Sequence, residues 1–152
     1  MSQQLTWITK SFAELSTREL YQLLQLRQEV FVVEQTCPYL DADGLDDQAT
    51  HLYALDAEGE MVAYARLFAA NESVPYTRIG RVISAGNVRR QGLGRELMRR
   101  AIEWCRQQHP QAPIRLGAQV YLRAFYQSFK FREIGDDYLE DGIPHVDMER
   151  AP

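Results

Sequence analysis

The feature that most constrains the fold is an arginine- and glycine-rich stretch, NVRRQGLGRELMRR (residues 87–100), placed between an apolar run and a helical pattern. The apolar run, Ile79–Ser84, predicts a strand, and helical spacing predicts a helix from Gly92 or Leu93 to about Gln108. The first turn of a helix leaves backbone N–H groups unpartnered and carries about half a positive charge. Glycines there let the oxygens of a ligand approach the backbone closely. This order of elements therefore predicts an anion site that suits a diphosphate.

Positive charge is concentrated around the same turn. The chain has a net charge of −4, yet eight arginines lie between Arg78 and Arg106, where the only acidic residues are Glu96 and Glu103. A local anion site inside an acidic protein explains this distribution, and the overall charge argues against general nucleic-acid binding. The alternative is a solvated arginine face whose glycines only shape a turn.

The motif differs from those of the common nucleotide-binding folds. A Walker loop needs a lysine directly after its last glycine, and no lysine lies near Gly92 and Gly94. The dinucleotide fingerprint needs a third glycine where this chain has Leu97. Ordinary nucleotide folds are therefore disfavoured.

The rest of the chain alternates between predicted strands and helices. A capping-box pattern at Ser16–Glu19 predicts the start of a first helix that ends near Glu34, and Asp56–Gly59 predicts a hairpin turn. Thr36–Asp47 and residues 135–145 are expected to be acidic loops. A short aromatic-rich helix is expected at Tyr121–Phe129, and strands at Leu5–Ile8, Leu52–Leu55, Met61–Phe68, Ile79–Ser84, Ile114–Ala118, Phe131–Ile134 and Val146–Glu149. This order predicts an α/β (α+β) fold with a central mixed sheet and helices on both faces.

Length and composition indicate one domain over residues 1–152. No stretch reaches the roughly 20 apolar residues of a membrane span, and the N-terminus lacks the pattern of a secretory signal. We therefore expect a cytoplasmic protein that does not bind membranes. The two cysteines, Cys37 and Cys105, make neither a disulfide framework nor a zinc site, so no metal is expected.

The hexapeptide Arg89–Gly94 matches the acetyl-CoA signature of the GNAT superfamily of N-acetyltransferases, which the chain resembles over nearly its whole length. QVYLRAFYQSFKF (Gln119–Phe131) is similar to the second motif of that superfamily, with Gln119 where Asn is usual and Lys130 where Gly is usual. Lys130 puts the tightness of that turn in doubt. The chain resembles the ElaA-like group in two stretches, RQEVFVVEQTCPYLDADGLDDQATHLYA and DGIPHVDM.

This resemblance implies the GNAT-type acyl-CoA N-acyltransferase fold, with a mostly antiparallel mixed sheet, and acetyl-CoA as the cosubstrate. It implies that strand-end backbone groups bond the pantetheine arm and the thioester, that the glycine-rich turn holds the diphosphate, and that the Gln119 amide bonds the arm. Tyr126 matches the tyrosine that protonates the departing thiolate. The implied cofactor-binding residues are Val82, Ile83, Ser84, Arg89, Arg90, Gln91, Gly92, Leu93, Gly94, Arg95 and Gln119.

Acetyl transfer to an amine needs a neutral amine, a donor to the carbonyl oxygen and a proton for the leaving thiolate. A phenol is protonated at neutral pH, so Tyr126 suits the last task, although it would serve equally as a packing aromatic. Glu34, His51 and His145 are candidate bases, each with a structural alternative. Asp41, Asp43, Asp46 and Asp47 either attract a cationic amine or form a solvated turn.

The first functional hypothesis is transfer to a small amine or peptide amine by direct attack in a ternary complex. Cys37 is the only candidate for a covalent carrier, and nothing near it in the sequence marks it as activated. The alternative is a non-catalytic acetyl-CoA sensor or interaction module with the same cofactor residues. Succinyl or propionyl transfer is a third option, and exposed strand edges are compatible with a homodimer.

Overall fold

The structure is a computed structural model that describes residues 4–85 and 92–152. A π-helical segment (Gln28–Glu34) follows the first helix directly. The main elements, in chain order, are β1 (Thr6–Ser11), α1 (Thr17–Arg27), β2 (Thr50–Leu55), β3 (Met61–Phe68), β4 (Thr77–Ser84), α2 (Leu93–Gln108), β5 (Ile114–Gln119), α3 (Arg123–Gln127), β6 (Arg132–Glu133), β7 (Tyr138–Glu140) and β8 (Ile143–Arg150).

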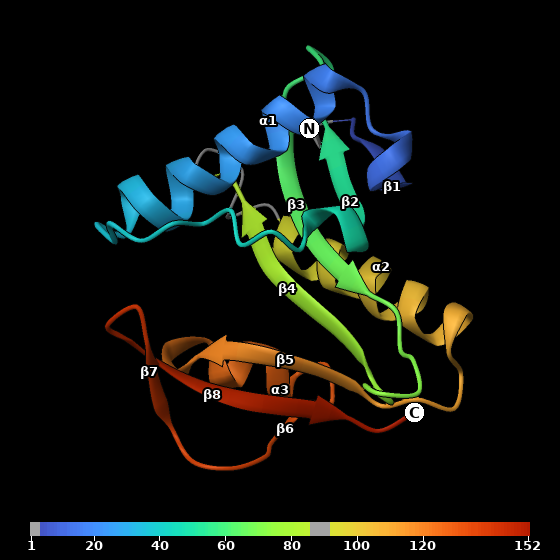
Figure 1. Cartoon of the computed structure of the whole chain (residues 1–152), viewed down its shortest axis with the longest axis vertical. Helices are drawn as coiled ribbons and strands as arrows, with labels where there is room; N and C mark the ends of the chain where they lie inside the picture. Colours follow the sequence, from blue (N-terminus) through green and yellow to red (C-terminus); the bar gives the residue numbers. More distant parts are fainter. Residues whose placement is uncertain (1–3, 86–91) are drawn as a thin grey trace.

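The described strands form one sheet in the order β1-β2-β3-β4-β5-β8-β6, and β7 also pairs with β8 (Figure 1). All neighbouring strands are antiparallel except β4 and β5, which are parallel. The mixed, mostly antiparallel sheet is therefore confirmed.

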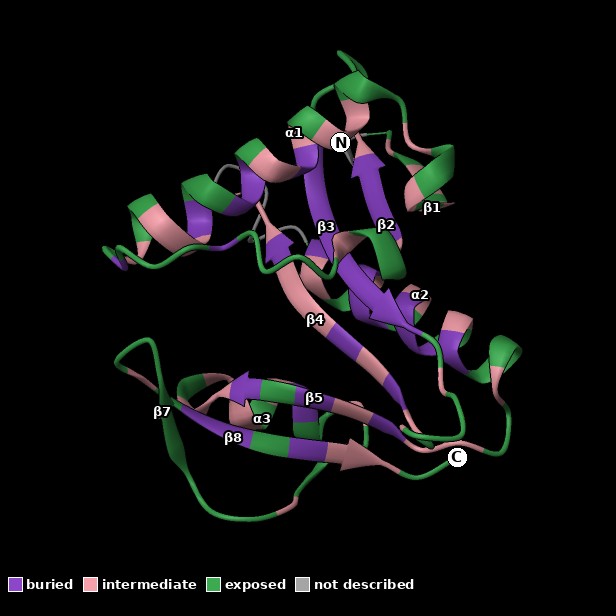
Figure 2. Ribbon diagram, viewed as in Figure 1, coloured by how far each residue is buried: buried purple, intermediate pink, exposed green. Residues whose placement is uncertain are grey.

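Helices cover both faces of this sheet, as the sequence predicts. On one face, α1 buries Leu23 and Leu26 against Tyr53 of β2. The residues on either side of Tyr53 in β2 belong to the core on the other face, where Leu97 of α2 is buried. Because successive side chains of a strand point to opposite faces, β2 serves both cores. β3 is buried over its whole length, and α1 and α2 lie on opposite sides of it (Figure 2).

The helix boundaries follow local chemistry. The Ser16 hydroxyl accepts a hydrogen bond from the Glu19 N–H at 3.0 Å, and the Glu19 carboxylate accepts one from the Ser16 N–H, so the capping box is confirmed. α1 itself ends at Arg27, and the chain continues to Glu34 as a π-helical segment, a form that is common at functional sites. α2 has the predicted bounds.

The prediction of a loop throughout residues 135–145 is wrong. Tyr138–Glu140 forms β7, and β8 begins at Ile143 rather than at Val146. The turn between them is Asp141-Gly142, with φ values of 53° and 77°, which is the geometry of a tight two-residue hairpin.

Lys130 adopts the left-handed conformation that glycine favours, with a φ of 72°. The tight turn after α3 is therefore kept, although a side chain in this region costs about 1–3 kcal/mol.

Candidate functional site

The candidate site lies where β4 and β5 separate. Among the described residues these strands pair only at their first two positions and then diverge (Figure 1). The register of β4 against β3 shifts a little further along the strand, between Gly80 and Ile83, where Arg81 adopts a φ of 51°. The edge of β4 that faces β5 therefore offers backbone N–H and C=O groups to a ligand rather than to a neighbouring strand.

Two cavities open along this gap. The inter-strand cavity, of about 370 Å³, is bounded by β4, β5 and the β7–β8 hairpin. The helix-end cavity, of about 480 Å³, lies between the end of β4 and the start of α2. The residues that line both cavities are Phe31, Gln35, Val82, Gln119, Leu122 and Tyr126. A ligand that fills the helix-end cavity can therefore meet a second ligand beside these residues.

The helix-end cavity brings together most of the described residues that were predicted to bind the cofactor. It is lined by Val82, Ile83, Ser84, Gly92, Gly94, Arg95 and Gln119. The Leu93 side chain is buried in the core, so only its backbone can take part. Arg89, Arg90 and Gln91 lie outside the described residues.

The two glycines fit a ligand that approaches the backbone closely. Gly92 caps α2 with a φ of 72°, a conformation that other residues rarely adopt. A Cβ atom on Gly94 would meet only a Phe125 ring atom, at an ordinary distance of 3.7 Å. Packing inside the protein therefore does not require glycine at position 94. A ligand that approaches the backbone there would require it, and the amides of the first helical turn fit a diphosphate.

Tyr126 stands at the junction of the two cavities. α3 supplies it, and T-shaped contacts with Phe125 and Phe131 hold its ring. Within the described ranges its hydroxyl makes no hydrogen bond. Burial, with a smaller contribution from Tyr121, raises the pKa of Tyr126 to about 12, so the hydroxyl keeps its proton at neutral pH.

His145 lies in the inter-strand cavity, at the start of β8. Its Nδ1 lies 2.7 Å from the Ile143 carbonyl oxygen, which can only accept a hydrogen bond. Nδ1 therefore carries the proton, and the Nε2 lone pair is left to accept one. The Glu140 carboxylate lies 3.5 Å from Nε2, and Tyr138 stacks on the ring. The arrangement leaves Nε2 as the atom that can accept a proton from a ligand in the cavity.

Glu34 lines the helix-end cavity and not the inter-strand cavity. Gln35, the next residue, accepts a hydrogen bond from the Gln119 amide at 3.4 Å. The end of the π-helical segment therefore contacts the same junction as β5.

His51 and Asp43 are placed away from both cavities. His51 is fully buried, and its Nε2 donates to the Asp46 carbonyl oxygen at 2.9 Å while its Nδ1 accepts from the Tyr64 hydroxyl at 2.6 Å. Burial lowers the pKa of His51, which keeps the ring neutral. Asp43 binds Arg66 through both carboxylate oxygens, each at 2.8 Å. Both residues therefore have structural partners where the sequence suggested substrate contacts.

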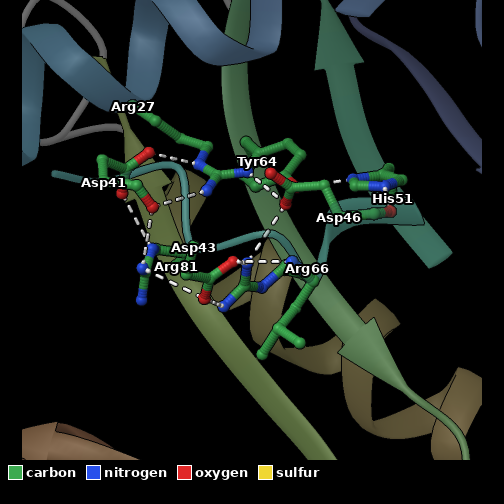
Figure 3. Close-up of polar contacts among 9 residues, drawn as sticks. Arg27, Asp41, Asp43, Asp46, His51, Tyr64, Arg66 and Arg81 are labelled. Carbon is green, nitrogen blue, oxygen red and sulfur yellow. Dashed lines mark hydrogen bonds and ion pairs between the residues drawn. The ribbon is translucent and has the colours of Figure 1, made fainter. Parts of the chain in front are cut away.

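The acidic loop is tied to the sheet by what we call the arginine–aspartate network (Figure 3). Its members are Arg27, Asp41, Asp43, Asp46, Arg66 and Arg81. Asp41 bridges Arg27 and Arg81, with a distance of 2.8 Å to each. Ion pairs thus neutralise most of the loop charge inside the protein. The loop is therefore neither a solvated turn nor a free acidic cluster that could attract a cationic amine.

The network also lowers carboxylate pKa values. Hydrogen bonds from Arg66, opposed by partial burial, lower the pKa of Asp43 to about 2. Burial opposes the charged form of Asp46, but the hydrogen bonds and charges of Arg27 and Arg66 outweigh it, and its pKa is also lowered.

Several residues of the inter-strand cavity were not predicted from the sequence. Cys37, Tyr39, Tyr138, Glu140 and Asp147 all line it. The Asp-Gly pair at 141–142 was the available signal, because such a pair between two short runs is typical of a hairpin. For Cys37 and Tyr39, which come from the acidic loop, no local pattern indicates the position.

In the described part of the chain, no helix is both long and apolar enough to pass through a membrane. The same residues contain no group of three His, Cys, Asp or Glu side chains that could hold a metal ion.

Comparisons with known proteins agree with this architecture. The family model described as "Acetyltransferase (GNAT) domain" matches residues 15–151. Protein ElaA of Escherichia coli (strain K12) is 44% identical over 145 residues, which are 95% of this chain and 95% of that protein. A crystal structure of an acyl-CoA N-acyltransferase from Pseudomonas aeruginosa has a TM-score of 0.93 at 45% identity, covering 97% of this chain and 100% of that one. The crystal structure of Escherichia coli ElaA has a TM-score of 0.91 at 42% identity, covering 97% and 99%.

Proposed function

Because the chain belongs to the GNAT acetyltransferase family, and within it to the ElaA-like group, we propose that it is an acetyl-CoA-dependent N-acetyltransferase. Its acceptor would be a primary amine of a small molecule or peptide. The observation that carries the proposal is the junction of the two cavities, where Val82, Gln119 and Tyr126 line both. A thioester held in one cavity would meet an amine held in the other at this point.

The cosubstrate supplies an activated acetyl thioester. The amides of Gly92–Gly94 and the side chain of Arg95 would hold its diphosphate, and the free edge of β4 would bond its arm. A backbone N–H near Val82 or Ile83 would stabilise negative charge on the carbonyl oxygen.

The acceptor side favours a cationic amine. Among the described residues, the inter-strand cavity is lined by the acidic residues Asp41, Glu140, Asp141 and Asp147 and by one arginine, Arg81. Asp41 is paired with Arg27 and Arg81, but the charges of Glu140 and Asp141 keep the electrostatic potential in the cavity negative. Such a field attracts an ammonium group, which must then lose a proton before it can attack.

His145 is positioned to take that proton. Its Nε2 would be the accepting atom, because Nδ1 donates to the Ile143 carbonyl oxygen, and the Glu140 carboxylate lies 3.5 Å from Nε2. Tyr126 then stabilises the departing sulfur by donating its hydroxyl proton. The Cys37 thiol donates to the Asp141 carbonyl oxygen at 3.2 Å, an arrangement of a protonated thiol that supports direct attack rather than a covalent carrier.

A pH series with a panel of primary amines tests this proposal. Free thiol released from acetyl-CoA should appear with at least one amine. In His145→Asn, we expect kcat/KM at pH 7 to fall by about 10–100-fold, and the loss should shrink toward pH 9 as the neutral amine becomes abundant.

The control is His109→Asn, which changes the same residue type just after α2, away from both cavities. Binding of CoA without turnover on any amine would instead favour the non-catalytic sensor. A His145→Asn deficit of the same size at every pH would remove the base role from His145. The acyl group, the cytoplasmic location and dimer formation stay predictions.

A further inference from the structure

A third cavity lies on the α2 face of the protein, and its lining is strongly basic. This basic cavity has a volume of about 680 Å³ and lies between the second half of α2, the turn after α3 and the end of β8. Its cations are Arg99, Arg106, Lys130 and Arg150, and Glu103 is the one acidic residue among its described lining. This concentration of positive charge occurs in a chain whose net charge is −4.

Three of these cations lack a carboxylate partner among the described residues. Arg99 pairs with Glu96 at 2.6 Å and with Glu103 at 3.8 Å, so it also takes up the charge of the one acid in the cavity. Arg150 donates only to backbone carbonyl oxygens, those of Phe129 and Ala151. Neither Arg106 nor Lys130 makes a side-chain hydrogen bond or ion pair within residues 4–85 and 92–152.

These cations act on one another as well. Partial burial, and then the charge of Arg106, lower the pKa of Arg150, so the two guanidinium groups share one electrostatic environment. Lys130 joins them from the left-handed turn after α3, at a φ of 72°. Like charges held together raise the energy of the free protein, and an anion that binds between them relieves the repulsion.

The shape of the basic cavity indicates the size and kind of anion. Ile102, Phe129 and Pro110 contribute apolar surface to the lining, beside the three cations that lack a carboxylate partner among the described residues. A volume of this size lies within the range of small-molecule sites. A guanidinium group can donate two parallel hydrogen bonds to the oxygens of one phosphate. Three neighbouring cations therefore favour a ligand that carries several negative charges.

We propose that the basic cavity binds a small oligophosphate, with room on its apolar side for a ring such as that of a nucleotide. The described lining of this site shares no residue with the inter-strand or helix-end cavities. The two sites adjoin at Arg95, which lines the helix-end cavity and contacts Ser128 and Phe129 of the basic cavity. Arg106 also lies about three helical turns beyond the first turn of α2, where the diphosphate of CoA would bind.

Titration calorimetry in metal-free buffer tests the proposal with inorganic tripolyphosphate, ATP and adenosine. With saturating CoA present to fill the diphosphate site at the start of α2, tripolyphosphate and ATP should bind with a stoichiometry of one, and more weakly as the salt concentration rises. Adenosine, which is uncharged, should bind at least tenfold more weakly than ATP. Arg106→Glu should weaken tripolyphosphate binding at least tenfold.

Arg18→Glu is the matched control, because it makes the same charge change on the exposed surface of α1, on the other face of the sheet. It should change tripolyphosphate affinity less than twofold. Equal losses in Arg106→Glu and Arg18→Glu would show a general charge effect and overturn the proposal. Loss of tripolyphosphate binding when CoA is present would place the anion in the cofactor site and overturn it as well. The comparison of Arg106→Glu with Arg18→Glu measures binding and not turnover. Its result is therefore independent of whether the transferase proposal is correct.

Discussion

Tyr126→Phe should lower kcat by about 100-fold or more while it leaves the affinity for CoA unchanged within about twofold. The substitution removes one hydroxyl at the junction of the two cavities and keeps the ring that packs on Phe125 and Phe131. The departing sulfur then loses its donor, whereas the contacts to the diphosphate and the arm stay in place. Steady-state kinetics with an active amine, combined with calorimetry for CoA, measures both quantities.

The deficit should also be constant between pH 6 and pH 9. Because burial raises the pKa of Tyr126 to about 12, its hydroxyl is protonated throughout this range and its contribution does not titrate there. Tyr21→Phe is the control, since Tyr21 is an exposed tyrosine of α1 far from the junction. An unchanged kcat in Tyr126→Phe would leave this tyrosine with a packing role only.

Arg27→Met should lower the free energy of unfolding at pH 7 by about 3 kcal/mol. Arg27 is fully buried, and its guanidinium pairs with Asp41 at 2.8 Å and with Asp46 at 2.6 Å. Methionine fills much of the same space but leaves both carboxylates with one arginine fewer. Because Asp41 keeps Arg81 and Asp46 keeps Arg66, the expected loss lies at the lower end for a broken buried pair. Denaturant unfolding at pH 7 measures it.

The effect of Arg27→Met should depend on pH in a defined direction. The folded-state pKa of Asp46 is lowered, so its ionised pairing stabilises the protein above the unfolded pKa, near 4, and this contribution is lost as the pH falls through the folded value. The difference between Arg27→Met and the original chain should therefore shrink below about pH 4. Arg18→Met, on the exposed side of α1, should change stability by less than about 0.5 kcal/mol. A loss for Arg27→Met no larger than this would mean that the network contributes nothing to folding.

The parts of the fold with strong local patterns were predictable from the sequence. α2 has an apolar stripe at helical spacing and a proline just beyond its end, and its predicted bounds are confirmed. β3 is a run of apolar residues interrupted only by Arg66 and bounded by turn residues, and its bounds are confirmed too. By contrast, β7 has only three residues, all of them exposed, so no alternation of polar and apolar residues marks it.

The site was only partly predictable because ion pairing depends on contacts between distant segments. The four aspartates of the loop look like a free acidic cluster in the sequence, but Asp41, Asp43 and Asp46 have arginine partners that lie 14 to 40 positions further along or back. His51 looked available as a base for the same reason, since its partner Tyr64 comes from the neighbouring strand. The cavity at the start of α2, in contrast, follows from a strand, a glycine-rich turn and a helix that are adjacent in the chain.

A crystal structure of the protein grown with acetyl-CoA tests the central claim most directly. We expect the diphosphate to accept hydrogen bonds from the amides of Gly92–Gly94, and the thioester sulfur to lie beside the Tyr126 hydroxyl, between β4 and β5. A cofactor bound elsewhere on the protein, or a helix-end cavity that stays empty at saturating acetyl-CoA, would contradict the account.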